Sequence, residues 1–335
     1  MSKNARPRRS ILYMPGSNAR ALEKGRTLAA DGLILDLEDA VAPDAKEEAR
    51  GRIRDAIKEG GYGKRELIIR VNALDTSWGH DDLVAAATMG SHAILLPKVE
   101  GESIVHQAEE IMATAGAPDD LAIWCMMETP SGMLHAEEIS HASPRVGALV
   151  MGTSDLAKDL QCAHTPDRLP FITSLGLCML AARAAGIAIL DGVHLNLNDD
   201  EGFQYSCNQG VELGFDGKTL IHPKTIDAAN KAFAPPAETI EWSKKIIAAH
   251  GEAASQGKGV VVVEGVRKGQ MLTGWVMQGN KTVRMKCLNT IPIGHKIALG
   301  AIANGDTVIK YGHDIGRGVE AIEKGGHVHT QNLKT

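Results

Sequence analysis

The sequence predicts a (β/α)8 TIM barrel followed by a small all-β module, and two observations carry this prediction. Eight short apolar runs recur at intervals of roughly 25 to 35 residues, with helical segments between them, which is the period of such a barrel. The runs lack polar alternation, as expected of parallel strands that are buried on both faces. A chain of 335 residues has room for one large domain and an appendage.

The strands are expected at Ser10–Met14, Gly32–Leu37, Glu66–Asn72, Ala93–Glu100, Leu121–Met127, Val146–Met151, Ile187–Asp191 and Gly217–Ile221. Polar residues follow nearly every strand at the same end, namely Glu38, Asp39, Arg70, Asn72, Lys98, Glu128, Asp155, Asp191 and His222. An open doubly wound sheet would concentrate such residues near one switch point, so this distribution favours a closed barrel.

Helices are expected between the strands, among them Ala19–Ala30 and Asp44–Glu59, and a further helix is expected over Ala237–Ala253. Beyond about Gly265 repeated glycines separate short β-branched runs such as Asp306–Lys310, which is typical of a small all-β module. We therefore predict a barrel domain over residues 1–265, a linker over 266–287 and a β-module over 288–335.

Composition excludes several classes of function. The net charge of −5 and the aromatic content of 4% give no reason to expect nucleic acid or an anionic membrane as partner. No apolar run reaches the roughly 18 residues that span a bilayer, and no signal-peptide core follows the basic N-terminus. The five cysteines show no C-x-x-C spacing, which indicates free thiols in a reducing cytoplasm and argues against zinc bound through them.

Glu128 and Asp155 are the candidate metal ligands. Each follows a buried strand, so both carboxylates are expected at the rim where barrels hold their ligands. Two such oxygens suit Mg²⁺, or alternatively Mn²⁺, with positions left for water and substrate. The competing interpretation is that both acids cap the helices that follow.

Arg70 is the candidate catalytic cation, with Glu38 or Asp39 fixing it or a metal-bound water. Such a site suits cleavage of a carbon–carbon bond beside a 2-keto acid, although Arg70 could instead form a salt bridge that closes the barrel mouth. An alternative role for Lys98 is to form a Schiff base with a carbonyl substrate, but the surrounding acids favour its protonated, non-nucleophilic form. His222 is either a general base, a ligand contact or a hydrogen-bonded structural residue.

These residues lie in motifs that resemble the citrate lyase β-subunit-like (HpcH/HpaI aldolase) family, over roughly Arg8 to Gly265. The motifs are Arg9-Ser-Ile-Leu-Tyr-Met-Pro-Gly-Ser, Asp36-Leu-Glu-Asp-Ala-Val, Arg70-Val-Asn, Leu96-Pro-Lys-Val-Glu, Glu128-Thr-Pro, Gly152-Thr-Ser-Asp-Leu and Gly217-Lys-Thr-Leu-Ile-His-Pro. The resemblance implies Mg²⁺ on Glu128 and Asp155, and substrate contacts from Arg70. It also implies a homotrimer or hexamer in which a C-terminal segment reaches the neighbouring subunit's site.

That C-terminal segment departs from the family pattern. The family continues after Glu264-Gly265 with a motif that carries a catalytic aspartate, whereas Val266-Arg-Lys-Gly-Gln-Met271 contains no acid. From about Leu288 the chain resembles the SAF domain of altronate and galactarate dehydratases, through Ile291-Pro-Ile-Gly-His-Lys-Ile-Ala-Leu and Gly326-His-Val-His-Thr-Gln-Asn. His295, His313, His327 and His329 would either converge on a metal or an acidic sugar, or remain surface residues.

The sequence thus predicts a Mg²⁺-dependent carbon–carbon lyase for a 3-hydroxyacyl-CoA of malyl-CoA, citramalyl-CoA or citryl type, releasing acetyl-CoA and a 2-keto acid. Two alternatives are a CoA-independent lyase for sugar-derived acids and a catalytically weak metal-binding regulatory subunit. Substrate contacts are expected from Arg9, Arg70, Asn72, Lys98, Gly152, Thr153 and His222. Arg8, Arg9 and Lys258 are also candidates for contacts to CoA phosphates.

Overall fold

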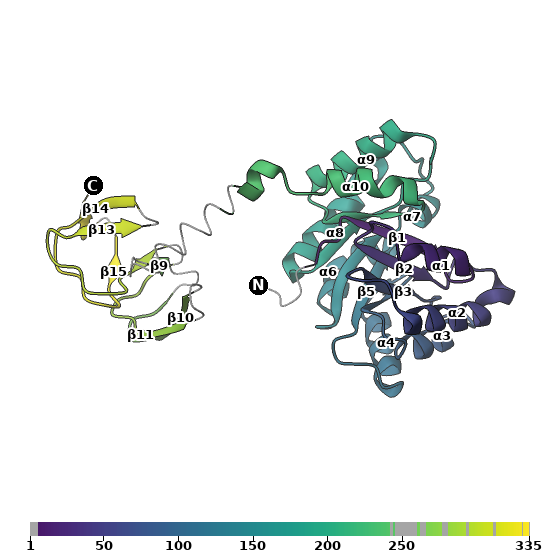
Figure 1. The fold of residues 1–335 in the computed structure, drawn as a ribbon, viewed down its shortest axis with the longest axis horizontal. Helices are drawn as coiled ribbons and strands as arrows, with labels where there is room; N and C mark the ends of the chain where they lie inside the picture. The colour runs from purple at the N-terminus through teal and green to yellow at the C-terminus, as the bar shows by residue number, and fades with distance from the viewer. Residues whose placement is uncertain are drawn as a thin grey trace. The chain divides into compact units, whose positions relative to one another are not determined.

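The computed structural model describes residues 6–241, 244, 260–261, 266–276, 281–292, 295–310, 313–329 and 331–334. The chain divides into two compact units, Met1–Ala234 and Pro235–Thr335 (Figure 1). None of the helices in the described part of the chain has the length and apolar character that crossing a membrane requires.

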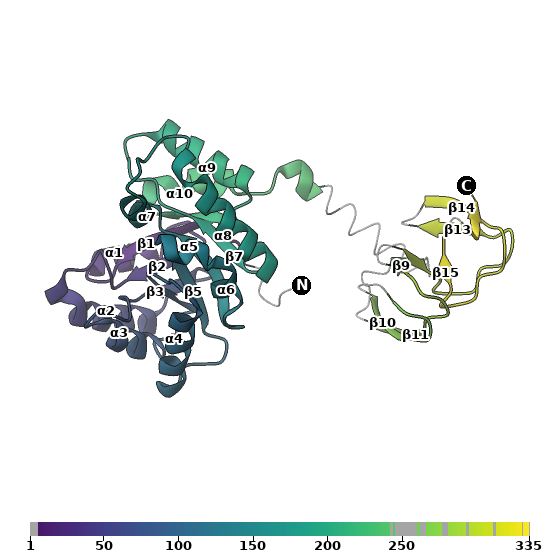
Figure 2. The same ribbon diagram turned by 180° about the vertical axis from the view of Figure 1, so that it is seen from behind.

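The first unit is a closed barrel of eight parallel strands, so the predicted fold class is confirmed. Each strand pairs with its neighbour in sequence, and β1 pairs with β8 to close the ring (Figures 1 and 2). The strands are β1 (Ser10–Pro15), β2 (Gly32–Asp36), β3 (Glu66–Arg70), β4 (Ala93–Leu96), β5 (Ala122–Met127), β6 (Val146–Met151), β7 (Ala188–Asp191) and β8 (Gly217–Leu220).

Helices surround the barrel: α1 (Ala19–Gly25), α2 (Lys46–Glu59), α3 (Gly79–Ala86), α4 (Glu102–Thr114), α5 (Pro130–Leu134), α6 (Ala136–His141), α7 (Thr153–Leu160), α8 (Ile172–Ala185), α9 (Asp200–Leu213) and α10 (Ile226–Ala232), with 3-10 turns η1 (Pro43–Ala45), η2 (Leu169–Phe171) and η3 (Pro223–Thr225). The helix predicted to reach Ala30 ends at Gly25, because the N–H of Arg26 bonds back to Glu23 O and that of Thr27 to Lys24 O in a tight last turn. Most of the helix predicted over Ala237–Ala253 lies outside the described residues.

Two apolar cores hold this unit together. The inner core fills the barrel with side chains such as Ile11, Ile34, Ile68 and Trp124, all fully buried. The larger outer core lies between the strands and the helices. Alternation along each strand sends successive side chains to one core or the other, so both faces are apolar and the strands show no polar period.

Strand register sets the level of the barrel mouth. Asp36, the last residue of β2, lies opposite Arg70, the last residue of β3. Met127 lies opposite Met151, which makes Glu128 and Gly152 neighbours directly beyond β5 and β6. The polar residues predicted at strand ends therefore reach one end of the barrel, because parallel strands share their carboxyl edge.

The second unit consists of short strands: β9 (Val260–Val261), β10 (Met271–Val276), β11 (Lys281–Lys286), β12 (Lys296–Ile297), β13 (Thr307–Lys310), β14 (His313–Gly318), β15 (His327–Val328) and β16 (Leu333–Lys334). They form a β10–β11 pair and three-stranded sheets in the orders β15-β12-β9 and β13-β14-β16. The predicted all-β character of this module is confirmed.

The predicted linker over 266–287 is wrong, because the residues of this range that the structure describes, 266–276 and 281–287, form part of the β-module. Strands β10 and β11 pair across six register positions, and Val266 bridges Ile291. Met285 and Cys287 are buried in one cluster with Val266 and Ile291. The five cysteines are free, and all except the half-buried Cys162 are buried.

Candidate active site

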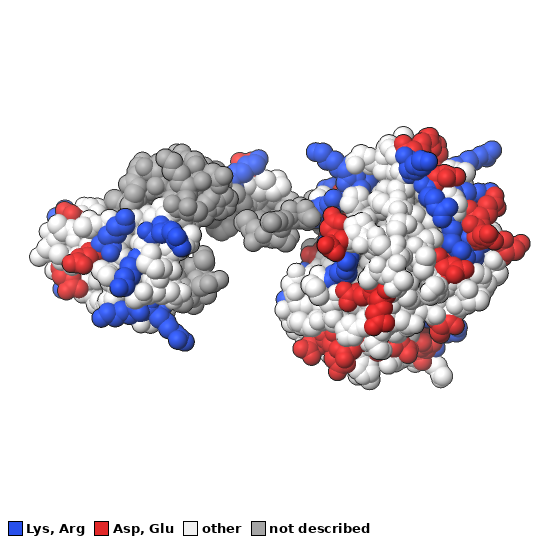
Figure 3. Space-filling view, turned by 90° about the horizontal axis from the view of Figure 1, so that it is seen from below, with Lys and Arg blue, Asp and Glu red and all other residues white. Residues whose placement is uncertain are grey.

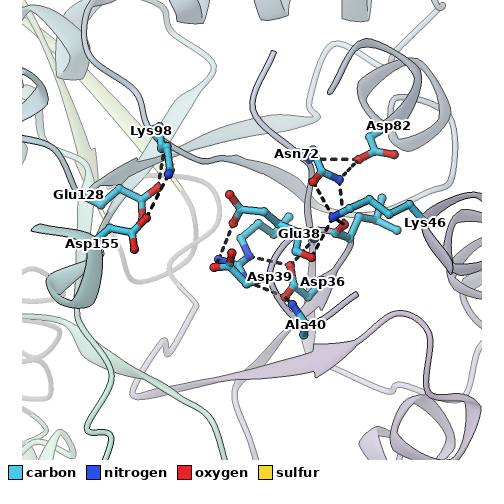
Figure 4. A network of polar contacts seen from close by, with 12 residues as sticks. Asp36, Glu38, Asp39, Ala40, Lys46, Asn72, Asp82, Lys98, Glu128 and Asp155 are labelled. Carbon is cyan, nitrogen blue, oxygen red and sulfur yellow. Dashed lines mark hydrogen bonds and ion pairs between the residues drawn. The ribbon is translucent and has the colours of Figure 1, made fainter. Parts of the chain in front are cut away.

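Glu128 and Asp155 meet at Lys98 on one side of the barrel mouth (Figure 4). Oε1 of Glu128 accepts the backbone N–H of Lys98 at 2.8 Å, and the Lys98 ammonium lies 3.2 Å from Oδ2 of Asp155. Lys98 has a φ of 50°, an unusual left-handed conformation for a side-chain-bearing residue. Both carboxylates therefore contact Lys98, Glu128 through the backbone N–H and Asp155 through the ammonium.

The chain approaches Glu128 closely at Gly152. A Cβ added to Gly152 would lie 2.5 Å from Cβ of Glu128 and 2.6 Å from its Oε2, so only glycine fits beside this carboxylate. Asp155 belongs to the first turn of α7, and Thr129 caps α5 by accepting the N–H of Gly132 at 3.1 Å. Thr129, not Glu128, therefore serves as the cap that the competing interpretation required.

Burial raises the pKa of Glu128 to about 7, and the neighbouring Asp155 charge adds to this rise. The Lys98 N–H and the more distant Arg70 and Lys98 charges oppose it without cancelling it. Glu128 is only 4% exposed. A buried carboxylate with so little compensation is a favourable ligand for a cation.

Arg70 lies on the other side of the mouth among three acids. Its Nε and Nη2 each donate to Asp36 at 2.6 Å in a bidentate pair, while Nη1 lies 2.6 Å from Glu38 and 3.2 Å from Asp39. Burial disfavours the charge, yet the Asp36 carboxylate holds the pKa of Arg70 well above its usual value. These contacts use at most four of the five guanidinium N–H groups.

The pKa of Glu38 is raised to about 8, mainly by burial; the charge of Arg70 opposes this rise, and the charges of Asp39, Glu128 and Asp36 add to it. Glu38 therefore holds a proton near neutral pH as the protein stands. Asp36 is left as the buried anion that balances Arg70, since its carboxylate makes the bidentate contact.

Tyr13 lies beneath Arg70, with the guanidinium carbon 4.8 Å from the centre of its ring. Its hydroxyl is buried and has no hydrogen-bond partner among the described residues. Burial raises the pKa of this phenol, as do the charges of Asp36, Glu128 and Glu38 against that of Arg70. The phenol is therefore a neutral hydrogen-bond donor without a partner among the described residues. Its pKa responds to the charges of both Arg70 and Glu128, which lie on opposite sides of the barrel mouth.

Asn72, expected to contact substrate, is instead engaged by the protein. Its amide nitrogen donates to Leu37 O at 2.8 Å and to Asp82 at 2.5 Å, and its oxygen accepts from Lys46 at 2.7 Å. Lys46 also donates to the carbonyls of Leu37 and Glu38 (Figure 4). With its amide used in this way, Asn72 positions the segment that carries Glu38, and its contact with substrate stays a prediction.

Arg9 is not brought to the mouth of its own barrel. It precedes β1 at the opposite end, where Nε and Nη2 pair with Asp31 at 2.8 Å. Arg8 pairs there in the same way with Glu66. Substrate contacts from Arg9 at the site formed with Arg70 are therefore corrected, because residues before a strand lie at its amino end.

Of the remaining expected residues, Thr153 opens α7 and is buried beside the site. His222 lies at the carboxyl end of β8, but its Nδ1 accepts the N–H of Lys224 at 3.1 Å, the arrangement expected of a structural histidine. Lys258 lies outside the described residues.

Sequence reasoning missed Asp36, Tyr13 and Lys46 as parts of the site. Asp36 could have been found, since it stands two residues after Ile34 and therefore on the same inward face of β2. Tyr13 follows the inward Ile11 by the same spacing. Lys46 carries no local signal, because only the tertiary fold brings it to Asn72.

The arrangement as a whole places two oxygen ligands for a hard cation opposite a guanidinium fixed by acids. No group of three or more His, Cys, Asp or Glu side chains in the part of the chain that is described stands ready to hold a metal by itself. A cation on Glu128 and Asp155 would therefore take further ligands from water or substrate, as Mg²⁺ commonly does.

The family model for HpcH/HpaI aldolase/citrate lyase matches residues 9–223, and that for the altronate/galactarate dehydratase SAF domain matches residues 252–335. A (3S)-malyl-CoA thioesterase of Cereibacter sphaeroides is 50% identical over 265 residues, covering 79% of this chain and 90% of that protein. A citrate lyase subunit beta of Leuconostoc mesenteroides is 36% identical over 267 residues, covering 78% and 88%.

Solved structures agree with these relatives. The citrate lyase beta subunit of M. tuberculosis, complexed with oxaloacetate and magnesium, is 30% identical with a TM-score of 0.59, covering 69% of this chain and 97% of that one. A CitE structure from the same organism, in complex with magnesium, acetoacetate and coenzyme A, has a TM-score of 0.60 at 28% identity, covering 80% and 93%. This chain belongs to the HpcH/HpaI aldolase/citrate lyase family.

Proposed function

We propose that this chain is a Mg²⁺-dependent carbon–carbon lyase for a 3-hydroxyacyl-CoA of the malyl-CoA type, which releases acetyl-CoA and a 2-keto acid. The observation that carries the proposal is that the Glu128 and Asp155 carboxylates both contact Lys98, one through its backbone N–H and the other through its ammonium, opposite the fixed Arg70 guanidinium. Carboxylate oxygens without nitrogen or sulfur ligands suit a hard cation, with Mn²⁺ as the alternative to Mg²⁺.

When bound, the cation would supply Lewis acidity to the carboxylate and hydroxyl oxygens of the substrate. Arg70 would offer its remaining N–H group to the oxygen on which charge grows as the carbon–carbon bond breaks. Asp36 holds the guanidinium plane for this task, and the Tyr13 phenol supplies a second donor from below. Lys46 and Asn72 keep the Glu38 segment in place.

The relatives support a CoA thioester as substrate, since several are named (3S)-malyl-CoA thioesterase and one similar solved structure is a complex with coenzyme A. Hydrolysis of the thioester is a second candidate reaction for the same site. The 50% identity to a (3S)-malyl-CoA thioesterase favours it, and so does the absence of any acid from Val266 to Met271.

One assay separates the two reactions. The full chain is incubated with Mg²⁺ and (3S)-malyl-CoA, and glyoxylate is trapped as a hydrazone while free CoA thiol is measured with a thiol reagent. Glyoxylate without free thiol supports the lyase. Free thiol without glyoxylate contradicts the lyase and supports the thioesterase. Neither product in Mg²⁺, or equal turnover in EDTA, would exclude the proposal.

Self-association is also proposed. Leu134, Leu169 and Leu180 lie on α5, η2 and α8 and are 79%, 70% and 71% exposed. Helix α8 contacts both α5 and η2, and exposed leucines on neighbouring elements favour a protein interface. Light scattering on the eluting full chain is expected to give the mass of a trimer or hexamer, and a monomer would contradict this.

A further inference from the structure

The second unit contains three histidine rings in mutual contact. Nδ1 of His295 lies 3.0 Å from Nε2 of His327, and the rings of His295 and His329 are stacked with centroids 4.4 Å apart. The third pair, His327 and His329, has centroids 5.3 Å apart. We refer to His295, His327 and His329 as the imidazole triad. The side chain of His313, the fourth histidine expected to converge here, lies outside the described residues.

The backbone beneath the imidazole triad is held from several sides. Strands β12 and β15 pair with Lys296 opposite Val328 and Ile297 opposite His327, and continuing this antiparallel register puts His295 opposite His329. Asn332 accepts the N–H of His329 at 2.9 Å and donates to His327 O at 2.8 Å. Asn289 accepts the N–H of His327 at 3.0 Å. The backbone that carries the imidazole triad is therefore held by the sheet and by two asparagines, while the side chains keep their rotational freedom.

The surroundings disfavour protonation of His327. Burial lowers the pKa of His327, and so do the adjacent His295, His329 and Lys296. Three protonated rings in such contact would repel one another, and this part of the chain is already basic. Residues 266–335 contain ten Lys or Arg against four Asp or Glu, and Figure 3 shows Lys and Arg predominating on the visible face of this module.

We propose that the imidazole triad is a binding site for a divalent transition metal of the Zn²⁺ type. Three histidine nitrogens are an established ligand set for such ions, with a fourth position left for water or an oxygen ligand. Mg²⁺ prefers oxygen ligands, so this site is distinct from the pair Glu128 and Asp155. The inference does not rest on the reaction proposed for the barrel.

The contact between His295 and His327 is the observation that favours a metal. Two nitrogens bound to one tetrahedral ion at about 2.05 Å lie about 3.3 Å apart. The observed separation of 3.0 Å is slightly shorter, as expected when two ring nitrogens share an N–H···N bond in place of a metal. Replacing that shared proton with an ion requires a shift of only a few tenths of an ångström for this pair.

His329 requires a larger adjustment. Its ring is nearly parallel to that of His295, with an interplanar angle of 5°, so a nitrogen from each does not yet point at one centre. This explains why no group of three such side chains among the described residues is ready to bind a metal as it stands. Rotation of the His329 side chain over the same backbone would bring in the third nitrogen.

The test uses the full chain in excess Mg²⁺, which occupies the oxygen ligands of the barrel. Zn²⁺ is then titrated by competition with a chromogenic chelator, and Co²⁺ is titrated while its visible absorption is recorded. The wild type is expected to bind one equivalent and to give the intense Co²⁺ spectrum of a four-coordinate site. His295→Asn and His327→Asn should each weaken Zn²⁺ binding by more than 10- to 100-fold. That range is typical when a residue supporting a metal ligand is lost, and these variants remove a ligand itself.

His141→Asn is the matched control, because His141 is an exposed histidine on α6 that bonds within its own helix. It is expected to bind Zn²⁺ as the wild type does. A measurement that needs no variant follows diethyl pyrocarbonate modification of the wild type by peptide mass. Zn²⁺, but not Mg²⁺, should protect His295, His327 and His329. Unchanged Zn²⁺ affinity in both triad variants, or absence of this protection, would overturn the proposal.

Discussion

The Arg70 guanidinium and the Asp36 carboxylate are joined by two hydrogen bonds of 2.6 Å, from Nε to Oδ1 and from Nη2 to Oδ2. The two residues end adjacent strands directly opposite each other, and both are buried. Asp36 thus sets the plane of the guanidinium, while Nη1 is left to contact Glu38 and Asp39. The acid that orients Arg70 is in the strand itself, not in the loop beyond it.

Asp36→Asn should therefore impair both stability and turnover. The amide keeps the shape of the carboxylate but removes the charge that balances Arg70, and leaving a buried charge uncompensated costs about 3 kcal/mol. We expect the free energy of unfolding to fall by about that amount, and kcat to fall because Arg70 loses its orientation. Urea denaturation and steady-state kinetics measure the two effects.

Asp39→Asn is the control for this substitution. The Asp39 side chain is 78% exposed and lies 3.2 Å from Nη1 of Arg70, so its loss should change the free energy of unfolding by less than about 1 kcal/mol. Equal destabilisation by the two variants would show that Asp36 does not hold Arg70 in the way described.

Gly152→Ala should remove Mg²⁺ binding without unfolding the barrel. The new methyl group would lie 2.5 Å from Cβ of Glu128 and 2.6 Å from Oε2, so the carboxylate must leave its position. Isothermal titration with Mg²⁺ should show at least a tenfold loss of affinity, within the range typical when the support of a ligand is disturbed.

Gly176→Ala provides the matched control, since a Cβ at Gly176 in α8 has nothing within 4 Å. Alanine is also the better helix former, so the control should be as stable as the wild type or slightly more so. If both alanine variants bind Mg²⁺ like the wild type, Glu128 does not ligate the ion from the position seen here.

The eight strands and the metal-ligand candidates were predictable from the sequence because a buried parallel strand leaves two readable signals. These are an apolar run and the polar residue that ends it, as in Val146–Met151 followed by Gly152 and Asp155. Such runs do not show to which face of the strand the side chain of a terminal polar residue points. Asp191 was counted with the residues of the mouth, but it shares the outward face of β7 with Ile189. It pairs there with the buried Lys218 at 2.7 Å and with Arg168 at 2.6 Å.

Contacts between residues far apart in the chain were also not predictable from the sequence. Lys46 lies in α2 and Asn72 follows β3, and nothing local indicates that the two side chains bond at 2.7 Å. The start of the β-module was missed for a related reason, because β10 and β11 are held by pairing with each other and by the bridge between Val266 and Ile291. Such pairing depends on tertiary context more than on local propensity.

Mg²⁺ affinity should depend on pH through Glu128. Its pKa is raised to about 7 in the absence of metal, so below that pH the carboxyl is protonated and the ion must displace the proton. Affinity should therefore rise about tenfold per pH unit up to pH 7 and level off above it. The metal-free protein should lose stability as pH rises from about 4.5 to about 7, because the folded state holds this proton more tightly than the unfolded chain.

Titration calorimetry in buffers of different ionisation enthalpy measures the proton release directly. About one proton per Mg²⁺ is expected at pH 6, and little at pH 8. Mg²⁺ affinity that stays constant between pH 6 and pH 8 would remove Glu128 from the site. Glu38→Gln serves as a comparison, since the Glu38 carboxyl lies with Arg70, and the proton released at pH 6 should persist in that variant.

Tyr13→Phe separates a role in substrate binding from a role in the fold. The Tyr13 hydroxyl is buried without a hydrogen-bond partner, so its removal breaks no contact in the described structure and relieves an unsatisfied polar group. Thermal unfolding should therefore occur at the same temperature as in the wild type, or slightly above it. If the phenol donates to the substrate oxygen that also faces Arg70, kcat should fall about tenfold, since a hydrogen bond to a charged group contributes about 1.5 kcal/mol. A variant as active as the wild type would show that this donor is not used, whereas a variant that unfolds at lower temperature would show that the hydroxyl has a structural partner.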